Sequence, residues 1–174
     1  ILADAKKDFD SVIVRPATVC GYSPRLRLDL TVNILTMHAL ERGVITVFGG
    51  EQLRPNINIK DMVSAYELLL EAPGDKINGE IFNAGYENHK VKDIALRVRE
   101  IVGNHVDIQY KKDNDNRSYH INSDKIKKVL GFVPKYTIED AVRSIMDARS
   151  QGLITNFDNS LYHNIKRMKE LNIK

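Results

Sequence analysis

The chain has 174 residues, 43% of them hydrophobic and 28% charged, which are the proportions of an ordinary globular protein. No apolar run approaches the ~20 residues of a membrane helix, and "ILADAKKDFD" lacks the apolar segment of a signal peptide, so we expect no membrane partner. The net charge of +3 arises from basic residues that are spread along the sequence, which argues against a nucleic-acid partner.

Cysteine and histidine usage limits the chemistry further. Cys20 is the single cysteine, which rules out an internal disulfide and fits a reducing, cytoplasmic compartment. The five histidines are scattered singly, so we expect no metal site. The first residue is isoleucine and the opening stretch reads like a helix already under way, which suggests a processed or partial chain.

Apolar runs and amphipathic stretches alternate along the whole chain, which predicts an α/β fold with parallel strands and crossover helices. We expect strands at 12–14, 44–48, 57–59, 80–84 and 106–110. We expect helices from Asp29 to just before Gly43, over 62–71 after an Asp61 cap, from Asp93 to 102, over 124–130 after a Ser123 cap, over 138–148 and over 161–171. Thr137 and Asp140 form a capping box for the helix at 138–148.

Several catalytic and phosphate-binding motifs are absent from the sequence. The ten glycines never form G-x-x-G-x-x-G or G-x-x-x-x-G-K-[ST], so no phosphate-cradling loop that opens a helix is found. Tyr-x-x-x-Lys occurs at Tyr86 and at Tyr162, a spacing at which a lysine could lower the pKa of the phenol on one helix face. Chance explains both matches, and Tyr86 follows Gly85 in an expected loop. We therefore assign no catalytic residue.

Two arginines are candidates for binding an anion. Arg54 precedes an expected strand, and Arg117 lies in the polar stretch "DNDNRSYHIN" between a strand and a helix. A guanidinium group stays charged and can chelate phosphate oxygens with two hydrogen bonds. The alternative is that both are ordinary surface arginines. Arg25 and Arg27, in the loop after Cys20, could likewise either bind phosphate or be solvated surface charges.

Four segments occur in a distinctive order: "VIVRPATVCG", "ITVFGGEQLRPNINIKDMVSAYELLLEA", "GEIFNAG" and "RSYHINSDKIKKVLGFVPKYTIEDAV". Together they resemble the C-terminal half of the extended short-chain dehydrogenases/reductases, the NAD-dependent nucleotide-sugar epimerases and dehydratases. The resemblance implies the last part of a Rossmann-type parallel sheet plus a smaller α/β substrate-binding lobe. It assigns residues 1–19 and 56–86 to the Rossmann domain and residues 20–55 and 87–174 to the nucleotide-sugar lobe.

The resemblance also implies roles for individual residues. NAD or NADP would contact Pro16 and Val19. The nucleoside-diphosphate sugar would be bound by Thr18, Asn33, Thr46, Phe48, Arg54 and Arg117. Arg54 and Arg117 would grip the diphosphate, Asn33 would lie near it, and Thr46 and Phe48 would lie along the base. Phe48 could instead be plain core, and where many relatives have tyrosine this chain has Cys20.

The implied activity is that of an epimerase or dehydratase working through a transient keto-sugar. Its glycine-rich loop and catalytic Tyr-x-x-x-Lys helix would lie upstream of Ile1, so this chain would mainly bind substrate. Relatives often dimerise through the Rossmann half, which leaves a homodimer open. The alternative is a non-catalytic, truncated module that binds nucleotide-sugars or another partner.

Overall fold

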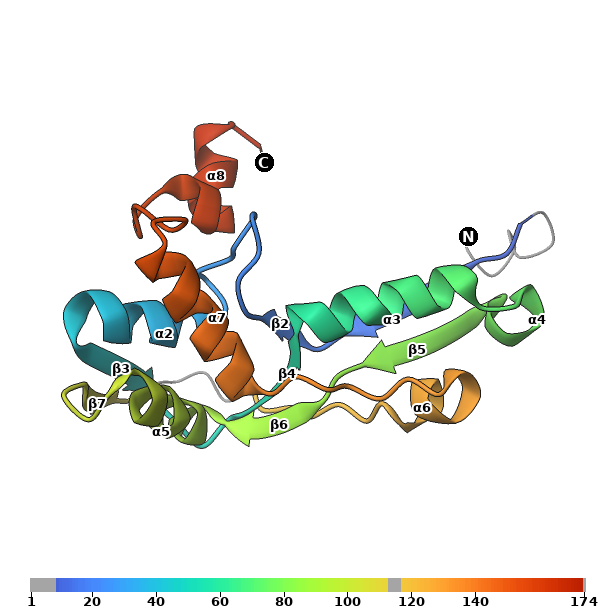
Figure 1. The fold of residues 1–174 in the computed structure, drawn as a ribbon, viewed down its shortest axis with the longest axis horizontal. Helices are drawn as coiled ribbons and strands as arrows, with labels where there is room; N and C mark the ends of the chain where they lie inside the picture. Colours follow the sequence, from blue (N-terminus) through green and yellow to red (C-terminus); the bar gives the residue numbers. More distant parts are fainter. Residues whose placement is uncertain (1–8, 113–116, 174) are drawn as a thin grey trace.

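The computed structural model describes residues 9–112 and 117–173. Within them, strands form three small sheets (Figure 1). In the first, β1 (Val12–Pro16) runs parallel to β5 (Glu80–Ala84), and in the third, β3 (Val44–Phe48) runs parallel to β7 (Asp107–Lys111). The middle sheet has β4 (Leu53–Asn58) between parallel β2 (Thr18–Cys20) and antiparallel β6 (Glu87–Lys90).

The helices follow the strands in the alternating order that the sequence predicts. They are α2 (Thr31–Arg42), α3 (Ile59–Glu71), α4 (Gly74–Ile77), α5 (Val91–Val102), α6 (Asp124–Leu130), α7 (Ile138–Ser150), the 3₁₀ turn η1 (Ser160–Tyr162) and α8 (Asn164–Glu170). Figure 1 shows α3, α4, β5 and α6 at one end of the molecule and α2, α5, β3 and β7 at the other. The α/β fold class is therefore confirmed, with one antiparallel pair that was not expected.

Strand predictions fail where strands are short or polar. β2 and β6 were not predicted, because three and four residues carry too little alternation to be recognised. The strand expected at 57–59 lies at Leu53–Asn58 instead, so Arg54 is within a strand and not before it. Register explains the extension, since Leu53 to Asn56 pair with Lys90 to Glu87.

Three helix starts differ from the expectation. α2 begins after Leu30, because the Asp29 carboxylate binds Arg27 instead of capping. α3 begins at Ile59, where the Asn58 side chain accepts from the Lys60 N–H at 3.1 Å. α5 begins at Val91, two residues before Asp93.

The remaining helix predictions have mixed outcomes. The capping box of Thr137 and Asp140 on α7 is confirmed. Ser123 precedes α6, but its side chain makes no cap hydrogen bond. The single helix expected at 161–171 is divided into η1 and the shorter α8.

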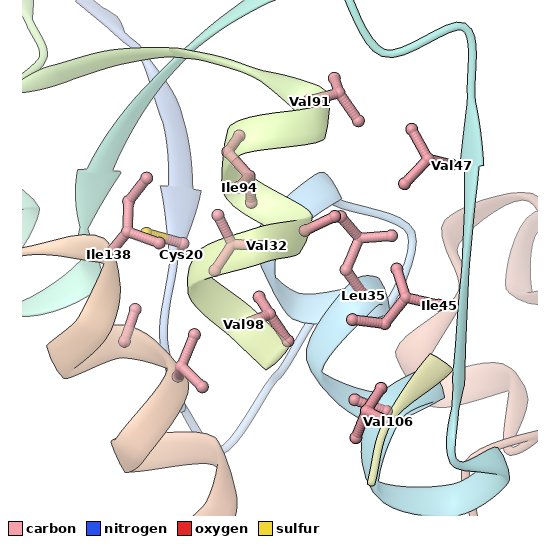
Figure 2. Packing of buried hydrophobic residues seen from close by; sticks show 14 residues of the cluster. Cys20, Val32, Leu35, Ile45, Val47, Val91, Ile94, Val98, Val106 and Ile138 are labelled. Atoms are coloured by element: carbon pink, nitrogen blue, oxygen red, sulfur yellow. The ribbon is translucent and has the colours of Figure 1, made fainter. Parts of the chain in front are cut away.

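Two large hydrophobic clusters stabilise the two ends of the molecule. The first joins α2, α5 and α7 to β3 and includes Val32, Ile45, Ile94 and Val142 (Figure 2). The second joins β1, β5 and α3 and is lined by Met62, Leu69 and Phe82, together with Ile126 of α6 and Phe132 just after it. The stretch from Ile126 to Phe132 thus packs with the expected Rossmann part, although the sequence assigns it to the substrate lobe. The division into lobes stays a prediction.

Candidate functional site

A cleft of about 410 Å³ opens where β1 ends and the chain passes into β2. Its walls come from the β1–β2 junction, the loop over residues 21–30, α2 and α3. The lining residues are Pro16, Ala17, Thr18, Val19, Gly21, Ser23, Arg25, Arg27, Leu30, Asn33, Ile59, Met62 and Tyr66. The carboxyl ends of parallel strands are the usual place for ligands in α/β sheets, and the end of β1 is such a place.

The position of the cleft follows from a change of sheet at Ala17. Its N–H donates to the Ala84 carbonyl at 2.7 Å, which ends the β1–β5 pairing, and Thr18 then pairs with Asn56 of β4. Four of the residues predicted to contact cofactor or substrate line this one cleft: Pro16, Thr18, Val19 and Asn33.

Asn33 shapes the loop over the cleft. Its side chain is 2% exposed, accepts from the Gly21 N–H at 3.0 Å and donates to the Arg27 carbonyl at 2.9 Å. Gly21 has φ +101°, a conformation that favours glycine, and an added Cβ would lie 3.3 Å from Ile59. Asn33 therefore holds the loop at Gly21 and at Arg27, which is a structural contribution that the sequence did not reveal.

Two arginines of this loop face the cleft with different partners. Arg27 makes a bidentate contact with Asp29, at 3.0 and 3.1 Å, whereas Arg25 donates to the amide oxygen of Asn164 at 3.1 Å. Burial raises the pKa of Asp29, but the hydrogen bond and charge of Arg27, with backbone N–H donors, outweigh it and lower the pKa overall. Arg27 is thus neutralised by a carboxylate, and Arg25 is oriented by a neutral group.

The two predicted clamp arginines lie next to each other. The Arg54 guanidinium donates to the Arg117 carbonyl at 2.5 Å and to the Leu53 carbonyl at 3.0 Å. It also lies over the Tyr119 ring, 5.7 Å from the centroid. Arg54 is two residues before Asn56, the strand partner of Thr18, which separates it from the cleft by about 7 Å along the strand. The Arg117 side chain itself is exposed.

Thr46 and Phe48 lie on the outward face of β3. Ile45 and Val47 are fully buried, so the alternate residues point away from the core, and Phe48 is 53% exposed. The alternative of Phe48 as a core residue is therefore wrong. Neither residue lines the cleft.

Other cleft residues were not identified from the sequence. Ile59, Met62 and Tyr66 reach the cleft from one side of α3. Their helical spacing shows that they share a helix face, but the sequence does not show what that face packs against.

Asn56 is a buried residue next to the cleft strand β2. It is 1% exposed, and its Oδ1 has no hydrogen-bond partner within residues 9–112 and 117–173. Its Nδ2 donates to the Arg54 carbonyl at 2.8 Å, so this residue supports the strand that carries Arg54.

Two observations on the described residues concern nucleophilic and metal chemistry. Cys20 is buried, and burial, followed by the charges of Glu87 and Asp61, raises the pKa of its thiol to about 12. No cluster of three or more histidine, cysteine or acidic residues arranged to hold a metal ion occurs there. Within the same residues, each helix is too short or too polar to cross a membrane.

Known proteins share both sequence and fold with this chain. Residues 2–85 match the model of the NAD dependent epimerase/dehydratase family. A dTDP-glucose 4,6-dehydratase of Shigella flexneri is 27% identical over 140 residues, which cover 73% of this chain and 38% of the relative. This chain therefore spans well under half the length of that relative.

Two solved structures extend the comparison to the fold. The dTDP-glucose 4,6-dehydratase of Bacillus anthracis, in complex with NAD, has a TM-score of 0.71 and 22% sequence identity to this chain. The match covers 95% of this chain and 50% of the dehydratase. The UDP-glucuronic acid 4-epimerase of Bacillus cereus, in complex with UDP-glucuronic acid and NAD, has a TM-score of 0.69 and 27% sequence identity to this chain. The match covers 80% of this chain and 45% of the epimerase. Sequence and fold thus agree in their similarity to the NAD-dependent epimerase/dehydratase family, whose model matches the first 85 residues of this chain apart from Ile1.

Proposed function

We propose that this chain forms the substrate-binding part of an NAD(P)-dependent epimerase or dehydratase acting on a nucleoside-diphosphate sugar. The observation that carries the proposal is the cleft, where Pro16, Thr18, Val19 and Asn33 meet beside the Arg54–Arg117 pair. Relatives named for dTDP-glucose and UDP-glucuronic acid support this substrate class.

The charges around the cleft suit a diphosphate. Such a ligand brings about two negative charges, and burying them without partners is costly. Arg54 and Arg117 are 63 residues apart in the chain but adjacent in space, and Arg25 and Arg27 lie on the cleft wall. Hydrogen bonds to charged groups are worth about 1.5–3 kcal/mol each, so two guanidinium groups could offset the desolvation.

The base would be held on the far side of the arginines by β3. Phe48 presents an exposed aromatic ring, and Thr46 lies on the same face of the strand two residues earlier. An exposed ring can stack on a flat base, and the Thr46 hydroxyl can donate or accept a hydrogen bond. These two residues are proposed contacts for the nucleotide and not for the sugar.

Pro16 and Val19 fit one apolar wall for a nicotinamide ring, since both line the cleft without a charged group of their own. NAD(P), when bound, supplies the capacity to take up and return a hydride. The residues of this chain orient the sugar and keep its diphosphate fixed during that exchange. The proton transfer falls to the tyrosine and lysine that the family resemblance places outside this sequence.

The β1–β5 pair and α3 form the surface on which a cofactor-binding half would pack. Parallel sheets are normally covered on both faces, yet among the described residues β1 and β5 pair only with each other. α3 exposes Val63, Tyr66 and Leu70 at spacings of three and four residues, and Leu70 is 87% exposed. We therefore place the rest of the Rossmann domain against β1, β5 and this helix face.

Calorimetry of the complete protein tests the proposal. UDP-glucose and dTDP-glucose are the probes, with uridine and thymidine as references that lack the diphosphate. The proposal requires tight binding of at least one nucleotide-sugar and weak binding of both nucleosides. A protein that binds neither sugar nucleotide contradicts it, and binding without turnover in the presence of NAD or NADP favours the non-catalytic module.

A further inference from the structure

Arg25 on the cleft wall is held by the C-terminal segment of the chain. Its Nη2 donates to Asn164 Oδ1 at 3.1 Å, a contact between residues 139 apart in sequence. Asn164 is the first residue of α8, so the contact ties the cleft loop to the start of that helix. No motif in the sequence points to this pairing.

Further contacts show that this segment packs against the cleft loop. The Leu28 N–H donates to the Tyr162 carbonyl at 2.8 Å, and the Asn164 N–H donates to Asp29 Oδ2 at 3.4 Å. Tyr162 packs against the buried cluster that contains Leu26 and Leu28. The loop over residues 21–30 is therefore fixed by Asn33 and by residues 162–164.

The partner of Arg25 leaves its charge in place. Arg27 meets a carboxylate, whereas the contact of Arg25 within the described residues is a neutral amide. An amide oxygen occupies one of the five N–H donors of a guanidinium and does not compensate its charge. Within residues 9–112 and 117–173, Arg25 is thus an oriented cation without a carboxylate partner, located at a cleft that is also lined by Thr18 and Asn33.

We propose that Arg25 binds an anionic oxygen group of the cleft ligand and that Asn164 is a positioning residue for it. The inference rests on the proposed function and adds a binding residue and a dependence on the C-terminal segment. The anionic group has two sources, the diphosphate of the nucleotide or a carboxylate on the sugar. The same chemistry serves both, and the choice of ligands separates them.

The first experiment measures binding to the complete protein by calorimetry. The probes are UDP-glucose and UDP-glucuronic acid, with uridine as the uncharged reference. R25Q is expected to weaken binding about tenfold, R25K to retain most of it, and uridine binding to stay unchanged. An equal loss for both sugar nucleotides identifies the diphosphate, and a loss confined to UDP-glucuronic acid identifies the sugar carboxylate.

The second experiment separates positioning from a purely structural contribution of Asn164. N164D keeps the acceptor for Arg25 and suits the first turn of a helix, but it supplies a counter-charge. We expect N164D to weaken binding of the charged ligands about as much as R25Q, and N164A to have no further effect when combined with R25Q. N159D is the matched control, because Asn159 lies in the same segment and accepts from the Leu161 N–H at 3.0 Å instead of facing Arg25.

Thermal unfolding confirms that each variant remains folded. A wild-type protein that binds the charged ligands, with R25Q and N164D binding them equally well, overturns the inference and leaves the proposed function intact. A loss in N159D as large as that in N164D also overturns it, since general charge would then be the cause. A wild-type protein that binds none of the ligands contradicts the proposed function, and this inference with it.

Discussion

The guanidinium of Arg54 donates to the main-chain carbonyl of Arg117, so the two arginines that the sequence singled out independently lie side by side. The Leu53 N–H also donates to the Ser118 hydroxyl at 3.0 Å, which fixes the 117–119 stretch along the start of β4. A ligand phosphate beside the Arg54 guanidinium would therefore lie near a stretch of main chain that is 63 residues further along the sequence.

Replacement of either arginine tests this arrangement. We expect R54A and R117A each to weaken binding of a nucleotide-sugar at least about tenfold, or 1.4 kcal/mol, because each removes a charged donor. R54K keeps the charge but loses the fork, so its binding should fall between those of wild type and R54A. The measurement is calorimetry of the complete protein. R143A is the control, because Arg143 is exposed on α7, where it pairs with Asp140 of the same helix. Unchanged affinity in both alanine variants would remove the clamp.

Asn33 provides a second prediction, which concerns the stability of the protein. N33D keeps the acceptor for Gly21 but places a carboxylate oxygen against the Arg27 carbonyl, in a site that is 2% exposed. A buried, unpaired polar group costs about 1–3 kcal/mol, more when charged, so the free energy of unfolding should fall by at least that amount. Urea unfolding measures it, with N104D on the exposed surface as the matched control. Equal stability of the two variants would contradict the structural contribution of Asn33.

Much of the fold could be predicted because it depends on local patterns. The β-branched run at 12–14, the glycine-closed strand at 44–48 and the Thr137 capping box each identify an element from a few neighbouring residues. The site was only partly predictable, because it depends on contacts between distant segments. Asn164 accepts a hydrogen bond from Arg25, which is 139 residues away in the sequence, and no local pattern predicts that contact.

The prediction for Asp61 failed for a related physical reason. An aspartate before an amphipathic stretch is typical of a helix cap, and the local pattern contains nothing else. In the structure, the Asp61 carboxylate instead accepts from the backbone N–H groups of Lys135 and Tyr136, both at 2.9 Å. These partners are more than 70 residues away, so only the tertiary fold reveals them.

Asp61 therefore offers a stability prediction. The Asp61 side chain is buried, since the residue is 2% exposed, so D61A leaves two backbone N–H groups without their acceptors. We expect the free energy of unfolding to fall by about 2–4 kcal/mol. The control is E67A, since Glu67 is exposed on the same helix and should change stability by less than about 0.5 kcal/mol. Urea unfolding of both variants gives the comparison, and a small effect in D61A would show that water replaces the carboxylate.

The exposed face of α3 tests the placement of the cofactor-binding half. Leu70 is 87% exposed in this structure, so an arginine there has no packing to disrupt unless another part of the protein covers it. If the Rossmann half packs on this face, L70R should destabilise the complete protein by about 1–3 kcal/mol. I165R is the matched control, because Ile165 is 69% exposed on α8. Equal stability of L70R and wild type in thermal and urea unfolding would contradict packing of a Rossmann half on this face.

Cys20 gives a pH-dependent prediction whose sign follows from its burial. Its thiol donates to the Ile57 carbonyl at 3.4 Å, and burial raises the pKa from 9.0 to about 12. Because the folded protein binds this proton more tightly than the unfolded chain, the contribution to stability is complete below pH 9.0 and is lost progressively between pH 9.0 and about 12. Urea unfolding between about pH 8 and 11 should therefore show a steeper alkaline loss of stability in wild type than in C20A, whose remaining groups titrate alike.

The Cys20 thiol should also resist alkylation at about pH 8 until the protein unfolds, because the thiolate is the reactive form. Rapid labelling of the native protein, or parallel pH profiles for the two proteins, would show that Cys20 is accessible to water.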